Sequence, residues 1–292
     1  MNLIRNLPGP LLIFLGALSL SFGGLIVKSF EGATLWQILF WRSLFFTLTV
    51  LLFLIISYKK QTFKSFYDSG LPGIFGGIIL SFGFCGYVFA MYNTTVANTN
   101  FIISLQILFL AIFGYFFLKE KINTITLISI ILAITGVLLM VGNSLTPGEL
   151  SGNLAAFTMP ISFAVLIMIV RKYPTVDMIP AQFIAGIFSC LIGFILSTKI
   201  MISPHDIFLG FLAGFFQVGF GFIFITIGAR TTPSAMVGII MLSESILGPV
   251  WAFLFVSERP SMFGLIGGAI ILSAVLLQFY TLLNKNKKSL SN

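Results

Sequence analysis

The acidic side chain best placed for chemistry in this sequence is Glu244, which lies inside a long apolar run at residues 234–256. It sits about ten residues into that run, so a helix would carry it roughly 15 Å into a membrane at ~1.5 Å per residue. A carboxylate at that depth is costly unless it is paired, hydrated or protonated. We therefore predict that Glu244 binds a cationic group or takes up a proton, with a protonated packing residue as the alternative.

The basic counterpart of this residue is Arg42, about seven residues into the apolar run 35–58 and roughly 10 Å from its outer end. A guanidinium stays charged and presents a planar fork that suits carboxylates and phosphates. We predict a clamp on a substrate anion, with a structural ion pair or snorkelling to the interface as alternatives. Arg42 and Glu244 together would suit a zwitterion such as an amino acid, or they would neutralise each other.

Amide and aromatic side chains inside other apolar runs are further candidates. Gln106 lies deep in the run 97–118, and Tyr87 places a hydroxyl at depth among small residues of the run 71–91. Aromatic rings around a pocket would favour organic cations or aromatic substrates. The predicted binding residues are Glu244, Arg42, Gln106, Tyr87, Trp41, Gln182 and Trp251.

Several classes of protein are disfavoured by the residue types present. The chain has a single histidine, His205, and its two cysteines, Cys85 and Cys190, each lie inside an apolar run. This pattern contains neither a metal motif nor a disulfide framework. The net charge of +8 comes from basic residues between apolar runs rather than from one polar face. The sequence therefore predicts no enzyme, no cofactor, no metal site and no nucleic-acid partner.

The composition is that of a membrane protein. Hydrophobic residues make up 58% of the 292 residues and charged residues only 8%, and the mean hydropathy is +1.09. A soluble domain carries roughly 25% charged residues. Spanning a bilayer takes about 20 apolar residues. We predict an all-α integral membrane protein with ten transmembrane helices, near 10–28, 35–58, 71–91, 97–118, 124–142, 151–171, 178–198, 206–228, 234–256 and 261–283.

The distribution of Lys and Arg predicts the orientation of these helices. With the N-terminus inside, twelve basic residues fall in cytoplasmic segments and three in outer segments. Cytoplasmic loops are the ones that carry such an excess. Both termini are therefore expected to face the cytoplasm. The three outer basic residues are Lys28, Lys199 and Arg259, and Lys28 is expected to snorkel at the interface.

The chain also contains an internal repeat with an offset of 138 residues. FLKEK at Phe117–Lys121 resembles FVSER at Phe255–Arg259, Thr94 falls on Thr232, and Gln106 falls on Glu244. Each half would hold five helices, an odd number, so the two halves must lie in opposite orientations. Inverted repeats of this kind are common in secondary transporters, with the binding site between them. We predict two five-helix repeats, residues 1–148 and 149–292.

Several short motifs carry a family resemblance. Glu244–Ser261 reads ESILGPVWAFLFVSERPS, with a mid-helix Glu, a Pro, a Trp and then Glu-Arg at the helix end. Its first-half equivalent is FFLKEK at Phe116–Lys121, Arg42 lies in FWRSLFF, and Thr94, Thr95 and Ala97 begin the fourth run. These motifs resemble the drug/metabolite transporter superfamily and, within it, the EamA-type ten-helix transporters.

The sequence departs from this family pattern in two respects. Gln106-Ile107 stands in the fourth helix where the family often has a Pro, which leaves the kink of that helix open. Lys119 and Ser257 stand at the helix ends where Gly is usual.

The resemblance implies a transporter of the bacterial cytoplasmic (inner) membrane that works by alternating access. The family contains many exporters, so export of neutral or aromatic amino acids is the first expectation. Import of a scavenged metabolite, such as a vitamin or a nucleotide-derived cofactor, is the alternative, and a passive channel is the hypothesis from a different class. Proton coupling through Glu244 and facilitated exchange both stay open. The expected partners are a small-molecule substrate, the lipid bilayer and protons, in a monomer or homodimer.

Overall fold

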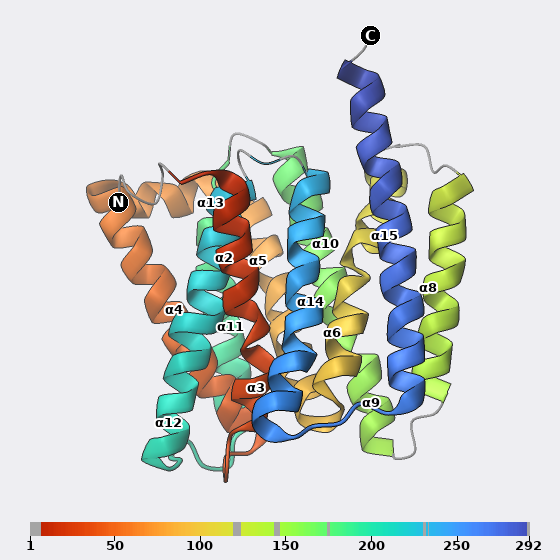
Figure 1. Cartoon of the computed structure of the whole chain (residues 1–292). Helices are drawn as coiled ribbons and strands as arrows, with labels where there is room; N and C mark the ends of the chain where they lie inside the picture. Colours follow the sequence, from red (N-terminus) through yellow and green to blue (C-terminus); the bar gives the residue numbers. More distant parts are fainter. Residues whose placement is uncertain are drawn as a thin grey trace.

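Apolar helices make up most of the computed structural model, and the majority run along one common axis (Figure 1). The structure describes residues 7–118, 124–142, 147–173, 176–229, 232 and 234–290. The helix-end residues Lys119, Glu120 and Lys121 lie outside the described residues. Helix α2 begins and helix α15 ends at the same end of the bundle, the upper end in Figure 1.

The elements of the first half follow the predicted runs closely, with two of the runs divided. They are α2 (Gly9–Ser21), α3 (Gly23–Lys28), α4 (Leu35–Tyr58), the 3₁₀ turn η1 (Lys59–Gln61), α5 (Thr62–Asn93), α6 (Val96–Ser104), α7 (Gln106–Leu118) and α8 (Thr124–Gly142). Helix α5 contains a break at Gly70, where φ is +50°, so its membrane-length part starts at Leu71 as predicted.

The second half has a similar pattern of whole and divided helices. Its elements are α9 (Pro147–Ala156), α10 (Thr158–Lys172), α11 (Ile179–Leu196), α12 (Pro204–Phe211), the π-helix η2 (Leu212–Phe220), α13 (Gly221–Ala229), α14 (Ser234–Val256) and α15 (Met262–Leu290). In the described part of the chain, six helical stretches are long and apolar enough to cross a membrane, and three further apolar helices are shorter. One of the six is the 59-residue stretch Leu35–Asn93, which holds both α4 and α5.

Three helices that the sequence predicts as continuous are broken near their middles. The breaks lie at Phe22, Leu105 and Phe157. A hydroxyl beside each break bonds to the carbonyl three residues earlier: Ser21 to Leu18, Ser104 to Phe101 and Thr158 to Ala155. Such side-chain bonds compete with the backbone ladder and bend helices. The fourth helix is therefore broken without the Pro that the family often has there.

The loop after α14 explains one departure from the family pattern. Ser257 adopts a left-handed conformation with φ of +54°. This turn lets the N–H of Glu258 donate to the carbonyl of Ala252, six residues earlier, at 3.2 Å, which closes the end of the helix. Glycine is the residue that tolerates this conformation best.

We expect Ser257→Gly to raise the thermal unfolding midpoint of the detergent-purified protein, because it relieves a left-handed strain of about 1 kcal/mol. Ser257→Ala is the matched control, since it removes the exposed hydroxyl but keeps the Cβ, and it should give no gain. Equal midpoints for the two variants would contradict the assignment of strain to Ser257.

Candidate functional site

A cavity lies inside the bundle, with walls from both halves of the chain. In this conformation its free space is small, enough for about one water molecule. Four of the predicted binding residues face it, together with apolar side chains and one further amide. The lining residues are Leu20, Arg42, Tyr87, Ile103, Gln106, Met159, Phe163, Gln217, Phe222, Ile225, Met241 and Glu244.

Arg42 enters the cavity from α4 and is only 3% exposed. Its guanidinium carbon lies 5.4 Å from the ring centre of Phe84 and 5.1 Å from that of Tyr87. Its Nε is buried without a hydrogen-bond partner, and no carboxylate of the described residues lies within 4.0 Å of the guanidinium. Aromatic faces attract a cation through their quadrupoles, so two rings hold this charge where an ion pair is absent.

The position of Arg42 depends on a close approach between α4 and the π-helix η2. A Cβ added to Gly214 would overlap the carbonyl oxygen of Arg42 and would come within 2.6 Å of the Cβ of Phe45. Only a residue without a side chain allows this contact. Gly210, four residues earlier, packs against Trp41 in the same way, and small residues at this spacing let membrane helices approach closely.

Glu244 lies on α14 and is 6% exposed. No hydrogen bond or ion pair joins its carboxyl group to another described residue. Arg42 and Glu244 thus line one cavity without forming an ion pair with each other in this conformation. Both groups therefore face the cavity without satisfying each other.

Two glutamines add amide groups to the same cavity. Gln106 follows the helix break at Leu105 and is 7% exposed. Gln217, in the π-helix, donates from Nε2 to the carbonyl of Leu20 at 3.3 Å, and its Oε1 is buried without a partner. Gln217 is not among the seven residues predicted from the sequence, where it is one amide in the apolar run 206–228 and nothing marks a π-helix.

The other three predicted residues lie outside the lining. The indole N–H of Trp41 donates to the carbonyl of Ile200 at 2.9 Å, and Gln182 donates to the hydroxyl of Thr226 at 2.6 Å. The indole N–H of Trp251 donates to the hydroxyl of Ser21 at 3.0 Å. In this conformation these side chains tie helices together. A binding role for any of the seven residues stays a prediction.

The apolar lining has no distinctive signal in the sequence. Phe163, Phe222, Met159 and Met241 form part of the wall, but the chain has 34 Phe and ten Met residues. Methionine is flexible and polarizable, so a wall with two of them adapts to ligands of different shape. The wall therefore combines groups that complement an anionic end, a cationic or hydrogen-bonding end and an apolar part of a small molecule.

The described residues contain no group of three His, Cys, Asp or Glu side chains that could hold a metal ion. The two cysteines are not joined to each other.

Comparison with known proteins gives a consistent set of matches. The EamA-like transporter family matches twice, over residues 7–142 and 146–280. A similar protein from Methanothermobacter thermautotrophicus, described as an uncharacterized transporter, is 25% identical over 206 residues. That match covers 64% of this chain and 58% of the relative's length. A solved crystal structure covers 92% of this chain and 96% of its own, with a TM-score of 0.64 and 16% identity, which shows a shared fold alone.

We expect Gly214→Ala to lower the thermal unfolding midpoint of the purified protein, because the added methyl group meets backbone that has no room to move. Overpacking of this kind costs about 1–3 kcal/mol. Gly148→Ala is the matched control, since a Cβ there meets nothing within 4 Å. An unchanged midpoint for Gly214→Ala would show that α4 and η2 can separate freely.

Proposed function

Because this chain belongs to the EamA-like transporter family, which matches both of its halves, we propose that it moves a small zwitterionic metabolite across a membrane by alternating access. Membership makes the chain an integral membrane transporter rather than an enzyme, and the predicted superfamily is confirmed. Membership in this family implies two partners, the lipid bilayer and a small-molecule substrate. Membership in the family does not specify the substrate, the direction of transport or the coupling, and these three are our proposals.

The proposed substrate class is neutral or aromatic amino acids, and the proposed direction is export. The observation that carries this proposal is the pair of unpaired charges, Arg42 and Glu244, on the wall of one cavity. Arg42 would bind the substrate carboxylate, and Glu244 would bind its ammonium group. The rings of Phe163 and Phe222 and the two methionines would contact an apolar or aromatic side chain. Import of a scavenged metabolite is the other direction open to the same cavity.

The proposed architecture has ten membrane-spanning segments in two inverted five-helix repeats, residues 1–148 and 149–292. It is supported by the repeat offset, by the two family matches and by the position of the first and last helices at one end of the bundle (Figure 1). We place both termini in the cytoplasm and the protein in a bacterial inner membrane, because of the excess of basic residues in the segments at that end.

The proposed coupling uses Glu244 as a proton carrier. A carboxyl group at this depth is stable when it is protonated or when it is paired with a cation. Binding the substrate ammonium would favour the ionised form, and release of the substrate would favour reprotonation. Exchange of a proton for the substrate at Glu244 would therefore couple proton movement in one direction across the membrane to substrate movement in the other. Facilitated exchange without a proton is the competing mechanism.

The substrate class can be tested with a ligand panel on detergent-purified protein. We expect neutral and aromatic amino acids to raise the unfolding midpoint, because they combine both charged ends with a side chain that suits the apolar part of the wall. Matched compounds that lack the carboxylate or the ammonium group should give much smaller shifts. Saturable counterflow of a labelled hit in proteoliposomes would support a carrier, whereas fast conductance that does not saturate would mean a channel.

Within the same assay we expect Arg42→Lys to reduce uptake of the best hit at least about tenfold, because a lysine keeps the charge but loses the planar fork. Lys64→Gln is the control, because it removes an exposed charge that does not line the cavity. It should leave uptake unchanged. Normal uptake by Arg42→Lys would remove Arg42 from the binding site.

We expect Glu244→Gln to abolish the stimulation of transport by a proton gradient, since an amide cannot carry a proton between the two faces. Counterflow at equal pH on both sides should persist at a reduced rate. The measurement is the initial rate of transport into proteoliposomes with and without an imposed pH difference. Stimulation equal to that of the wild type would exclude Glu244 as the proton carrier.

A further inference from the structure

The short helix α3 lies at the end of the bundle opposite the termini (Figure 1). It has six residues, from the break at Phe22 to Lys28. A Cβ on Gly23 would overlap the Tyr87 hydroxyl and would lie 2.7 Å from Nε2 of Gln217. Both of these side chains line the cavity, so α3 is the segment that covers them on this side.

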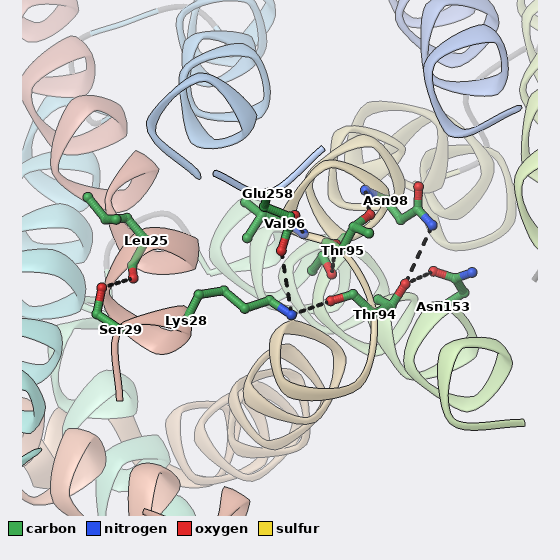
Figure 2. A network of polar contacts seen from close by, with 10 residues as sticks. Leu25, Lys28, Ser29, Thr94, Thr95, Val96, Asn98, Asn153 and Glu258 are labelled. Carbon is green, nitrogen blue, oxygen red and sulfur yellow. Dashed lines mark hydrogen bonds and ion pairs between the residues drawn. The ribbon is translucent and has the colours of Figure 1, made fainter. Parts of the chain in front are cut away.

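The far end of α3 is held by one charged side chain. Lys28 Nζ lies 3.6 Å from Oε2 of Glu258 and donates to the carbonyl of Thr94 at 2.8 Å. Oε1 of Glu258 accepts from the backbone N–H of Val96 at 2.6 Å. Figure 2 shows Lys28 reaching from α3 across to these groups. The contact joins α3 to the start of α6 and to the connection between α14 and α15.

Further hydrogen bonds extend this contact across both halves of the chain. The hydroxyl of Thr94 donates to Oδ1 of Asn153 on α9 at 2.7 Å, and it accepts from Nδ2 of Asn98 at 3.4 Å (Figure 2). Thr94 and Asn98 belong to the first half, whereas Asn153 and Glu258 belong to the second. The network therefore joins the two halves at this end of the bundle. Lys28, which the sequence predicts to snorkel at the interface, instead bonds to Thr94 and pairs with Glu258.

The near end of α3 is anchored differently. The ring of Phe22 stacks on Trp251 with centres 5.2 Å apart, and the Trp251 indole bonds to Ser21. The chain is thus fixed at the break itself. The two residues that follow are Gly23 and Gly24, which have the backbone freedom to change conformation.

We propose that α3 is the gate of the cavity at the end opposite the termini, turning about the Phe22 break, and that Lys28 and Glu258 form the latch that keeps it closed. The inference rests on the proposed alternating access and adds the element that performs it at one end. Both latch side chains are partly exposed, at 25% and 17%. Partly exposed ion pairs contribute modestly, which suits a contact that must break in every cycle.

The gate can be tested by measuring access to the cavity from each side. In a background with Cys85→Ala and Cys190→Ala, the variant Ile103→Cys places one thiol on the lining. A membrane-impermeant maleimide is then applied from one side of oriented membranes at a time. We expect Lys28→Met to raise the labelling rate from the Lys28 side about fivefold, the shift that losing one partly exposed pair produces. Labelling from the other side should not rise.

Three further variants separate a latch from a general loss of stability. Lys28→Arg keeps the cation and should label at the wild-type rate. Glu258→Gln should match Lys28→Met, and the double variant should exceed neither, because both changes remove the same pair. Gln37→Leu is the control: it removes a different buried tie at the same end, the bond from Gln37 Nε2 to the carbonyl of Lys199 at 2.8 Å. It should leave labelling unchanged.

Unchanged labelling in Lys28→Met, or an equal rise from both sides, would overturn the gate. So would additive effects of the Lys28 and Glu258 changes. Maleimide labelling needs no substrate, so an error in the proposed substrate class would leave this result intact. Conversely, a failed gate would leave the ligand panel unaffected.

Discussion

The structure depends on the burial of a guanidinium that no carboxylate of the described residues neutralises. Arg42 is 3% exposed, and the rings of Phe84 and Tyr87 lie against its charge. A charge in such a place is expensive unless something replaces its hydration. Here the replacement is aromatic and incomplete, since Nε has no partner. The incomplete replacement gives an anionic ligand a reason to bind, which a satisfied ion pair would not.

Several features far from Arg42 in the sequence serve this arrangement. The missing side chain of Gly214 lets α4 lie against the π-helix, and the π-helix in turn brings Gln217 to the cavity. Tyr87 contacts the guanidinium with its ring face and the start of α3 with its hydroxyl side. A movement of α3 would therefore shift Tyr87 and change its contact with the guanidinium of Arg42. The proposed binding site and the proposed gate share Tyr87, whose contacts would couple occupancy to closure.

The repeated halves of the chain contribute unequally to the cavity. Gln106 and Glu244 occupy equivalent positions of the repeat, and both line the cavity. One position supplies a neutral amide and the other an acid. At this pair of positions the two walls therefore differ in charge type, beside the guanidinium of Arg42 that also lines the cavity. The ion pair of Lys28 with Glu258 likewise draws one partner from each half.

Which segments form helices, and which residues are buried at depth, followed from the sequence alone. Apolar runs of membrane length predicted the helical segments to within a few residues, because water-free surroundings require every backbone group to bond within its own segment. The motifs at Glu244–Ser261 and the repeat offset indicate the family that the comparisons show, whereas the left-handed conformation of Ser257 is visible only in the structure. Depth along a run also singled out Arg42, Tyr87, Gln106 and Glu244, which the structure brings to one cavity.

Only the tertiary structure decided which way those residues face and where the helices break. These helices are apolar around their whole circumference, so periodicity cannot distinguish a wall of the cavity from a surface that packs or faces lipid. That is why Trp41, Gln182 and Trp251 looked equal to the lining residues in the sequence although they tie helices together. Local hydroxyl bonds that compete with the backbone lie beside the breaks at Phe22, Leu105 and Phe157. Glycines follow the first break and Pro160 follows the third, but the break at Leu105 has neither beside it. Contacts between residues as distant as Lys28 and Glu258 exist only once the halves have packed.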